Sequence, residues 1–96
     1  MTRFVWDVQK ELENIARHNV NFEAALLAFE DPNRSILFDP AHSSTEERFF
    51  CFGKVGHKIL TVRFTYRGSD VRIIGAGYWR KGEKIYEKEK KKRRFS

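Results

Sequence analysis

Three β-prone runs follow one another in the second half of the chain, with only a few residues between them. They cover Glu47–Val55, Lys58–Tyr66 and Asp70–Gly77. The pair Gly56-His57 is typical of a two-residue type II′ hairpin, which has glycine at its first central position. Connections this short join antiparallel neighbours, whereas parallel strands need a long crossover. The chain is therefore constrained to form an antiparallel sheet around these three strands.

The two hairpins determine which side chains share a face of this sheet, because opposite residues in paired strands point the same way. Pairing Val55 with Lys58, and Tyr66 with Val71, predicts one apolar face and one mixed face. The apolar face consists of Phe49, Cys51, Leu60, Val62, Phe64, Val71 and Ile73. The mixed face consists of Arg48, Phe50, Phe52, Thr61, Arg63, Thr65, Arg72 and Ile74. A register shift of one residue would exchange the two faces.

Two helices are expected ahead of this sheet. The first follows Asp7, a favourable N-cap residue, and continues to about His18-Asn19. Its apolar residues recur at helical spacing and are Val8, Leu12, Ile15 and Ala16. The second helix can be capped by Asn21 and must end before Pro32. We expect both helices to pack on the apolar face of the sheet.

A strand over Arg34–Asp39 and a C-terminal helix from Arg80 complete the expected order of elements. The chain has 96 residues, the length of one domain, so we predict a single domain over 1–96. Its fold class is α+β, with two N-terminal helices packed on an antiparallel β-sheet and a C-terminal helix after it. Residues 88–96 form a basic tail that we expect to fray.

The net charge of +6 comes entirely from the C-terminal end. Residues 1–79 carry ten basic and ten acidic side chains, whereas residues 80–96 carry nine basic and three acidic ones. A run of Lys and Arg is often a solvated chain end, and it can also add salt-dependent affinity for nucleic acid. The overall charge therefore indicates little about the rest of the domain, which is neutral by count.

Several classes of protein are excluded by what the sequence lacks. A single cysteine, Cys51, allows neither an intramolecular disulfide framework nor a thiolate zinc cluster. No two histidines have ligand spacing with a carboxylate, so we expect no metal site and no cofactor. The longest apolar run, Ala24–Phe29, is too short to span a bilayer, and the first residues contain no secretory h-region. We therefore expect a cytoplasmic protein with no membrane partner.

The mixed face carries the most informative chemistry, because Arg48, Arg63 and Arg72 share it with Phe50 and Phe52. Guanidinium groups bind phosphate bidentately, and aromatic rings stack on unpaired bases. This combination suits a phosphodiester ligand. The alternative is a solvated sheet face whose aromatic side chains are covered by the C-terminal helix. Both can hold together if the helix leaves an arginine-lined groove.

A histidine lies in the loop before the Arg48 strand. His42 could reach the mixed face and act there as a general acid or base, because imidazole exchanges a proton near neutral pH. The alternative is that Asp39 and Ser43 organise a turn in which His42 has no chemical role. The sequence leaves both interpretations open.

Short motifs along the chain form an ordered pattern. They are Phe4-Val5-Trp6-Asp7, Lys10, Asn14, Arg17-His18, Val20-Asn21-Phe22-Glu23-Ala24-Ala25, Phe29-Glu30-Asp31-Pro32, Asp39, His42-Ser43, Glu47-Arg48-Phe49, Gly53, Thr65, Arg67, Arg72-Ile73-Ile74, Glu83 and Tyr86. This pattern, which runs from about residue 4 to residue 87, resembles that of the BrnT toxin family. Each motif is weakly specific alone, whereas their order and spacing together are fairly specific.

The resemblance implies a RelE-like fold and a ribonuclease that blocks translation. It also implies an inhibitory partner, a BrnA-like antitoxin with a ribbon-helix-helix DNA-binding part, and a complex that represses its own operon. Operator DNA is then a partner only through the antitoxin. The expected function is that of an endoribonuclease toxin of a type II toxin–antitoxin system, acting on RNA without a metal ion.

Cleavage of RNA needs a base for the 2′-hydroxyl, positive charge for the phosphorane and an acid for the leaving oxygen. We assign the charge to Arg48 and Arg72, because preorganised charge stabilises such a transition state effectively. His42 and Glu83 are the candidates for proton transfer. The residues expected to bind RNA are Arg63, Arg67, Arg80, Lys81 and Lys84.

One segment departs from the family pattern. Where BrnT-like sequences commonly have Ile-Ser-Ala-Arg, this chain has Ile74-Gly75-Ala76-Gly77, so that Gly77 replaces the expected arginine. The segment that follows, Tyr78-Trp79-Arg80-Lys81-Gly82, is also atypical. Arg80 or Lys81 could supply the missing charge. If neither does, the chain is a non-catalytic member that binds RNA or antitoxin. A third possibility is a small basic accessory protein of the ribosome or chromosome that binds through its tail.

Overall fold

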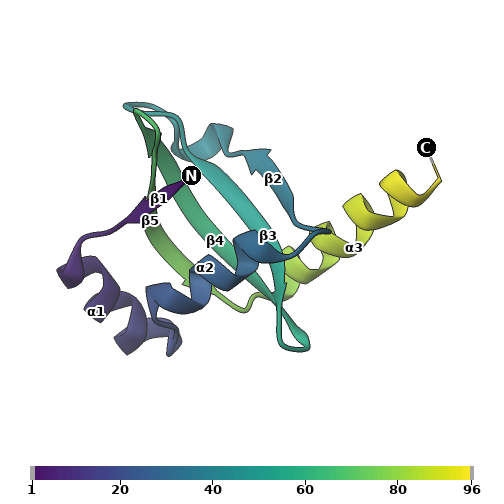
Figure 1. The fold of residues 1–96 in the computed structure, drawn as a ribbon, viewed down its shortest axis with the longest axis horizontal. Coiled ribbons are helices and arrows are strands. Elements are labelled where there is room, and N and C mark those ends of the chain that lie inside the picture. Colours follow the sequence, from purple (N-terminus) through teal and green to yellow (C-terminus); the bar gives the residue numbers. More distant parts are fainter. Residues whose placement is uncertain (1, 96) are drawn as a thin grey trace.

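The computed structural model describes residues 2–95, which form a five-stranded sheet and three α-helices (Figure 1). In chain order the elements are β1 (Arg3–Val5), α1 (Val8–His18), α2 (Phe22–Glu30), β2 (Ser35–Phe38), the short 3-10 helix η1 (Pro40–His42), β3 (Phe49–Val55), β4 (Lys58–Arg67), β5 (Asp70–Gly77) and α3 (Arg80–Arg94). The strands lie side by side in the order β1-β5-β4-β3-β2. The predicted α+β class is confirmed.

The register predicted for the β3–β4 hairpin is confirmed. The two strands pair antiparallel, with Val55 opposite Lys58 and Phe49 opposite Phe64. Gly56 has a left-handed φ of 65°, a conformation that glycine adopts without steric cost. The residues of β3 and β4 therefore lie on the apolar and mixed faces to which the sequence assigned them.

The β4–β5 hairpin also has the predicted register near its turn, with Thr65 opposite Arg72. A bulge then sets Arg63 opposite Gly75 and leaves Ile74 outside the ladder. Such an extra residue reverses which side chains of β5 face each side of the sheet from that point on. The bulge thereby places Ala76 on the apolar face opposite Val62.

β1 makes the sheet mixed rather than wholly antiparallel, which corrects the expectation from the sequence. It pairs parallel with β5, with Phe4 opposite Val71, and Arg3 forms an ion pair with Asp70 at 2.7 Å. The short turns in the sequence do not predict this pairing. Most of the chain lies between β1 and β5, so no short turn sets the direction of β1.

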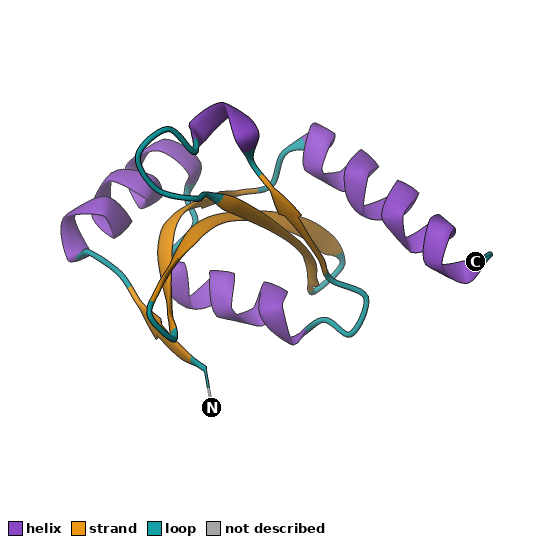
Figure 2. Cartoon of the chain, turned by 90° about the horizontal axis from the view of Figure 1, so that it is seen from above, coloured by secondary structure: helices purple, strands orange, loops and turns teal. Residues whose placement is uncertain are grey.

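α2 packs on the apolar face, as predicted. The sheet arches over this helix, while η1 and α3 lie on the other side (Figure 2). The buried core contains Phe22, Ala25, Ala28, Cys51, Leu60, Val62, Phe64, Val71 and Ile73. A Cβ at Gly53 would collide with the backbone of Ala28, so glycine there allows helix and strand to approach closely. This packing holds the sheet together.

α1 packs differently from the expectation. Its apolar stripe faces solvent, since Val8, Leu12 and Ile15 are 66%, 55% and 38% exposed. The buried residue of α1 is Asn14, whose side chain donates to the carbonyl of Ala76 at 2.9 Å and accepts from its amide at 3.1 Å. β1 pairs only with the first part of β5, so these backbone groups have no neighbouring strand there. Satisfying them sets the rotation of α1.

α3 runs to Arg94, beyond the point at which we expected the tail to fray. The hydroxyl of the buried Tyr86 donates to the carboxylate of Asp31 at 2.6 Å. Further along the helix, the Arg93 guanidinium donates to the carbonyl of Arg34 at 3.2 Å. These contacts attach both halves of α3 to the segment between α2 and β2, so the basic end is ordered to Arg94.

Candidate functional site

The face of the sheet opposite α2, here called the outer face, is covered only in part. η1 lies near one end of this face and α3 near the other (Figure 2). Two features remain accessible on it. One is an arginine cluster next to η1, and the other is an apolar groove next to α3.

The arginine cluster consists of Arg48, Arg63 and Arg72. Arg72 lies opposite Thr65, and Arg63 precedes Thr65 by two residues on the same face of β4, about 7 Å along the strand. The predicted pairing of Val55 with Lys58 would set Arg48 opposite Thr65, but the ladder begins one residue later, at Phe49. The Thr65 hydroxyl instead donates to the carbonyl of Glu47 at 2.6 Å, which holds the segment before β3 in the same row. The structure thus brings all three arginines into adjoining rows.

The three guanidinium groups differ in their partners. Within residues 2–95, Arg63 and Arg72 have no ion pair and no side-chain hydrogen bond. Arg48 contacts Glu46 at 3.2 Å, and Glu46 also contacts Arg67 at 3.7 Å. The Nε of Arg48 is buried and lacks a hydrogen-bond partner in the described part of the chain. The cluster therefore presents two unpaired cations and one cation held in place by a carboxylate.

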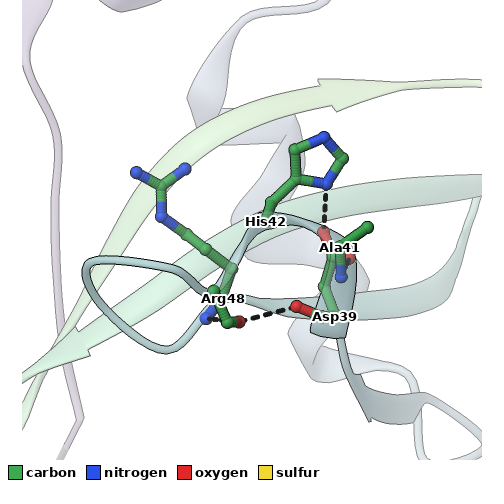
Figure 3. A network of polar contacts seen from close by, with 5 residues as sticks. Asp39, Ala41, His42 and Arg48 are labelled. Atoms are coloured by element: carbon green, nitrogen blue, oxygen red, sulfur yellow. Dashed lines mark hydrogen bonds and ion pairs between the residues drawn. The ribbon is translucent and has the colours of Figure 1, made fainter.

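The loop before β3 is closed onto that strand by a network of hydrogen bonds (Figure 3). The amide of Asp39 donates to the carbonyl of Arg48 at 2.8 Å. Ser43 Oγ donates to the carbonyl of Asp39 at 2.6 Å and accepts from the amide of Arg48 at 2.8 Å. The buried Asp39 carboxylate also accepts from the amide of Ala41 at 3.1 Å, which caps η1. Asp39 and Ser43 thus organise the loop and fix it relative to Arg48.

His42 projects from this loop on the same side as the Arg48 guanidinium (Figure 3). Its Nδ1 lies 2.8 Å from Asp39 Oδ2, and its side chain is 62% exposed. A carboxylate next to Nδ1 favours the tautomer with the proton on that nitrogen, which leaves the lone pair of Nε2 free. An oriented and accessible imidazole of this kind is suited to accept a proton from a ligand.

The groove has a volume of about 580 Å³ and lies between the sheet and α3. Its apolar walls include Leu37, Trp79 and Ile85, together with Phe50 and Phe52, whose rings stack with centroids 5.6 Å apart. Arg63 and Lys81 also line it, and no carboxylate does. Arg63 therefore belongs to both the cluster and the groove, so the two features are continuous.

The segment that departs from the family pattern shapes this groove. A Cβ at Gly77 would collide with the indole of Trp79, so the ring lies directly against the Gly77 backbone. The indole also contacts the ring of His18 in an edge-to-face arrangement, with ring centroids 5.0 Å apart. A Cβ at Gly82 would collide with Thr61 Oγ1, so glycine there lets α3 approach the sheet closely. The ring of Trp79 thus occupies the place that an arginine side chain at position 77 would need.

Glu83 lies away from the arginine cluster. It lies beside Ile59 at the hairpin end of β4, together with Lys58. Thr65 is six residues further along the same strand, a distance of about 20 Å. The structure therefore does not bring together the two residues that the sequence offered for proton transfer.

The basic residues predicted at the start of α3 also separate. Lys81 lines the groove, Arg80 lies beside Lys58 and Tyr78 at the hairpin end, and Lys84 is exposed on the helix. Lys81, rather than Arg80, therefore brings positive charge to the outer face.

Sequence reasoning gave no role to Glu46 or Trp79. The atypical segment after Gly77 is the signal that points to Trp79. For Glu46 the sequence holds no such signal, because side-chain positions in a loop follow no simple period.

Within residues 2–95, no three His, Cys, Asp or Glu side chains are grouped so that they could hold a metal ion. None of the helices there has the length and apolar character of a bilayer-spanning segment.

A family model described as the ribonuclease toxin BrnT of type II toxin–antitoxin systems matches residues 6–83. The matched region contains His42 and all three arginines of the cluster, as well as the Gly77–Gly82 segment. Comparison with curated proteins gives no match.

Proposed function

The chain belongs to the BrnT family of ribonuclease toxins of type II toxin–antitoxin systems, and we propose that it is itself an endoribonuclease toxin that cuts single-stranded RNA and inhibits translation. The observation that carries this proposal is the arrangement of the outer face. There the loop that carries His42, an oriented and accessible imidazole, is hydrogen-bonded to the backbone of Arg48, a member of the arginine cluster. RNA is the substrate and an antitoxin the partner that this family membership implies.

The arginine cluster is suited to hold the RNA backbone. The unpaired guanidinium groups of Arg63 and Arg72 can each bind a phosphate through two hydrogen bonds. The buried Nε of Arg48 has no acceptor, and a phosphate oxygen would supply one. Arg67 shares Glu46 with Arg48 and would help to position the backbone at the rim of the site.

We assign the base to His42. Its Nε2 takes the proton of the ribose 2′-hydroxyl, and the 2′-oxygen then bonds to the neighbouring phosphorus. Arg48 and Arg72 stabilise the negative charge that develops on the phosphorane oxygens. The bond from phosphorus to the 5′-oxygen breaks, and this oxygen takes a proton from water. The products are a 2′,3′-cyclic phosphate and a 5′-hydroxyl end, and no step requires a metal ion.

The finer assignments follow the family expectation. We propose a RelE-like toxin that acts in the cytoplasm and is held inactive by a BrnA-like ribbon-helix-helix antitoxin. Operator DNA would be bound only by the complex, through the antitoxin. Glu83 and Lys84 lie away from the cluster, so we propose no proton-transfer role for Glu83 and only a peripheral contact with RNA for Lys84.

The proposal is tested with the purified chain, freed of antitoxin and incubated with single-stranded RNA in the presence of a metal chelator. We expect cut RNA with cyclic phosphate and 5′-hydroxyl ends, strong loss of cutting in Arg72→Ala, and growth arrest when the chain is induced in cells. An exposed arginine on α1 provides the control, because Arg17→Ala should cut normally. Intact RNA in vitro together with normal growth on induction would contradict the proposal.

A second candidate is a non-catalytic member that binds RNA or antitoxin without cutting. The observation that favours it is the Trp79 indole against Gly77, because this contact excludes the arginine expected there. The test is Gly77→Arg combined with Trp79→Ala, which provides both the charge and the space for it. If the parent chain does not cut RNA and the double variant does, the second candidate is correct.

A further inference from the structure

We infer that the groove beside α3 binds one unpaired base of the RNA, next to the phosphate that the arginine cluster holds. This inference rests on the proposed function and deepens it. It assigns the recognition of a base to residues in the segment that departs from the family pattern. By binding a particular base, the groove would determine the position at which this protein cuts a single-stranded RNA.

The lining of the groove suits a ligand with one flat apolar part and one anionic part. Phe50 and Phe52 stack on each other, and Trp79 forms another aromatic wall. Arg63 and Lys81 are the charged residues of the lining, and both are cationic. A nucleotide has this combination, because its base stacks on aromatic rings and its phosphate pairs with cations. The volume of about 580 Å³ lies within the usual range of small-ligand sites.

The position of the groove ties it to the cluster. Arg63 lines the groove and lies about 7 Å from the Thr65–Arg72 row along β4. A nucleotide with its base in the groove would therefore place its phosphate on Arg63. The RNA strand would continue from that phosphate toward Arg72.

Three residues of this sequence make the groove possible. Gly77 gives the Trp79 indole its place, and Gly82 lets α3 approach the sheet so that the helix forms the far wall. An arginine at position 77 would displace the indole from that wall. Glycine in place of arginine at position 77 therefore removes one cation from the site and allows the Trp79 ring to form part of the groove wall.

The test measures the binding of short single-stranded RNA with 2′-methoxy groups, which cannot be cut because the attacking hydroxyl is blocked. In a Trp6→Phe background, Trp79 is the remaining tryptophan. Its fluorescence should be quenched by the intact oligonucleotide. Quenching should be lost when one nucleotide, found by scanning each position in turn, lacks its base.

Matched variants separate stacking from charge. Trp79→Ala should weaken binding of the intact oligonucleotide by about 5- to 150-fold, the usual effect of losing one stacked base. The same variant should bind the abasic oligonucleotide as the parent does. Tyr78→Ala is the control, because Tyr78 is the neighbouring exposed aromatic residue and does not line the groove. Phe50→Ala repeats the test if Trp79→Ala does not fold.

Three other results would contradict the inference or the proposed function. Equal weakening for intact and abasic RNA, or none for either, would show that the groove binds no base and would overturn the inference. The inference is also wrong if Trp79→Ala keeps RNA binding but releases the antitoxin, because the groove is then a protein-docking surface. Failure of the parent chain to bind any RNA would overturn the proposed function itself.

Discussion

α2 and α3 lie on opposite faces of one sheet, and they bury different amounts of apolar surface against it. α2 buries Phe22, Ala25 and Ala28 completely and lies close to the sheet at Gly53. α3 buries Gly82 and Tyr86, and Tyr86 packs with Phe52 and Ile59 in a smaller apolar cluster. Polar contacts such as that of Tyr86 with Asp31 also hold α3 to the segment before β2. One helix closes the core, whereas the other leaves a groove beside it.

The two faces of this sheet therefore have different roles. Apolar burial on the α2 face provides most of the stability, because that burial is the main favourable contribution to folding. The outer face has a smaller buried cluster around Phe52 and Tyr86, and beside it unpaired cations and partly exposed aromatic side chains. Substitutions on the two faces should therefore affect different measurements.

The largest expected effect is on the α2 face. Phe64→Ala should lower the free energy of unfolding by about 3–5 kcal/mol, because Phe64 is fully buried among aromatic rings from α2, β3 and β4. Trp79→Ala on the outer face should cost clearly less, since that ring is partly exposed. Urea unfolding of both variants measures the two values. Equal losses would mean that the outer face contributes to the core as much as the α2 face.

The next effect is on catalysis. His42→Gln keeps a donor for Asp39 but cannot accept a proton at neutral pH, so RNA cutting should slow by about 10²- to 10⁴-fold. His57→Gln, in the exposed β3–β4 turn, is the control and should cut at the parent rate. If His42→Gln retains full activity, His42 only stabilises the loop.

A smaller effect is expected from the contact between Gly77 and Trp79. Gly77→Arg should lower the free energy of unfolding by about 1–3 kcal/mol, because the new side chain collides with the indole. Adding Trp79→Ala should recover part of this loss, whereas two independent sites would show additive losses. Urea unfolding of the two single variants and the double variant measures the coupling. Strict additivity would show that the two residues do not compete for space.

The smallest effect concerns the polar attachment of α3. Partial burial alone would raise the pKa of the Asp31 carboxyl, but hydrogen bonds from Tyr86 and from the amides of Lys54 and Asn33 hold it below its ordinary value. Burial, together with the bond to Asp31, raises the pKa of the Tyr86 hydroxyl. Tyr86→Phe should cost about 1 kcal/mol near neutral pH, because the carboxylate keeps its amide donors.

This difference between the parent and Tyr86→Phe should depend on pH. A lowered pKa gives stability that is lost as pH falls, so the difference should shrink below the ordinary aspartate value of 3.8. A raised pKa gives stability that is lost as pH rises, so the difference should also shrink above the ordinary tyrosine value of 10.0. Unfolding followed across this range checks both limits, with the exposed Tyr66→Phe as control. A constant difference would mean that the contribution of the Tyr86 hydroxyl does not depend on the ionisation of either group, which would contradict the prediction.

The sequence predicted well where local geometry decides the outcome. Short turns determine a register, so the faces of β3, of β4 and of β5 up to its bulge could be inferred, and with them the shared side of Arg63 and Arg72. The rotation of α1 could not, because the apolar stripe through Leu12 suggested burial. The deciding factor was the unpaired backbone of Ala76, which Asn14 satisfies. Such a requirement appears only once the sheet is assembled.

In the candidate site, too, some features follow from local sequence patterns and others depend on contacts between distant elements. Alternation along the strands placed Arg63 and Arg72, whereas Arg48 lies just before β3. The loop position of His42 suggested its proximity to Arg48. Glu83 is distant from the cluster because α3 crosses the sheet near Ile59, about 20 Å along β4 from Thr65, and a helical period does not reveal this crossing point. The groove depends on contacts of Gly77 and Gly82 with residues from other elements, so no local pattern could predict it.

The central claim is that RNA is cut on the outer face, and that the basic end of α3 is secondary. Two variants remove the same charge from the two places: Arg63→Gln with Arg72→Gln, and Lys92→Gln with Arg94→Gln. Arg93 is kept because it holds α3 to the segment before β2.

The rate of cutting of single-stranded RNA by the antitoxin-free chain, at one salt concentration, compares them directly. The outer-face variant should be slower by about 100-fold or more, since it loses charge at the reacting phosphate. The tail variant should lose no more than about tenfold, the share expected of non-specific phosphate contacts. An equal or larger loss in the tail variant would contradict the account.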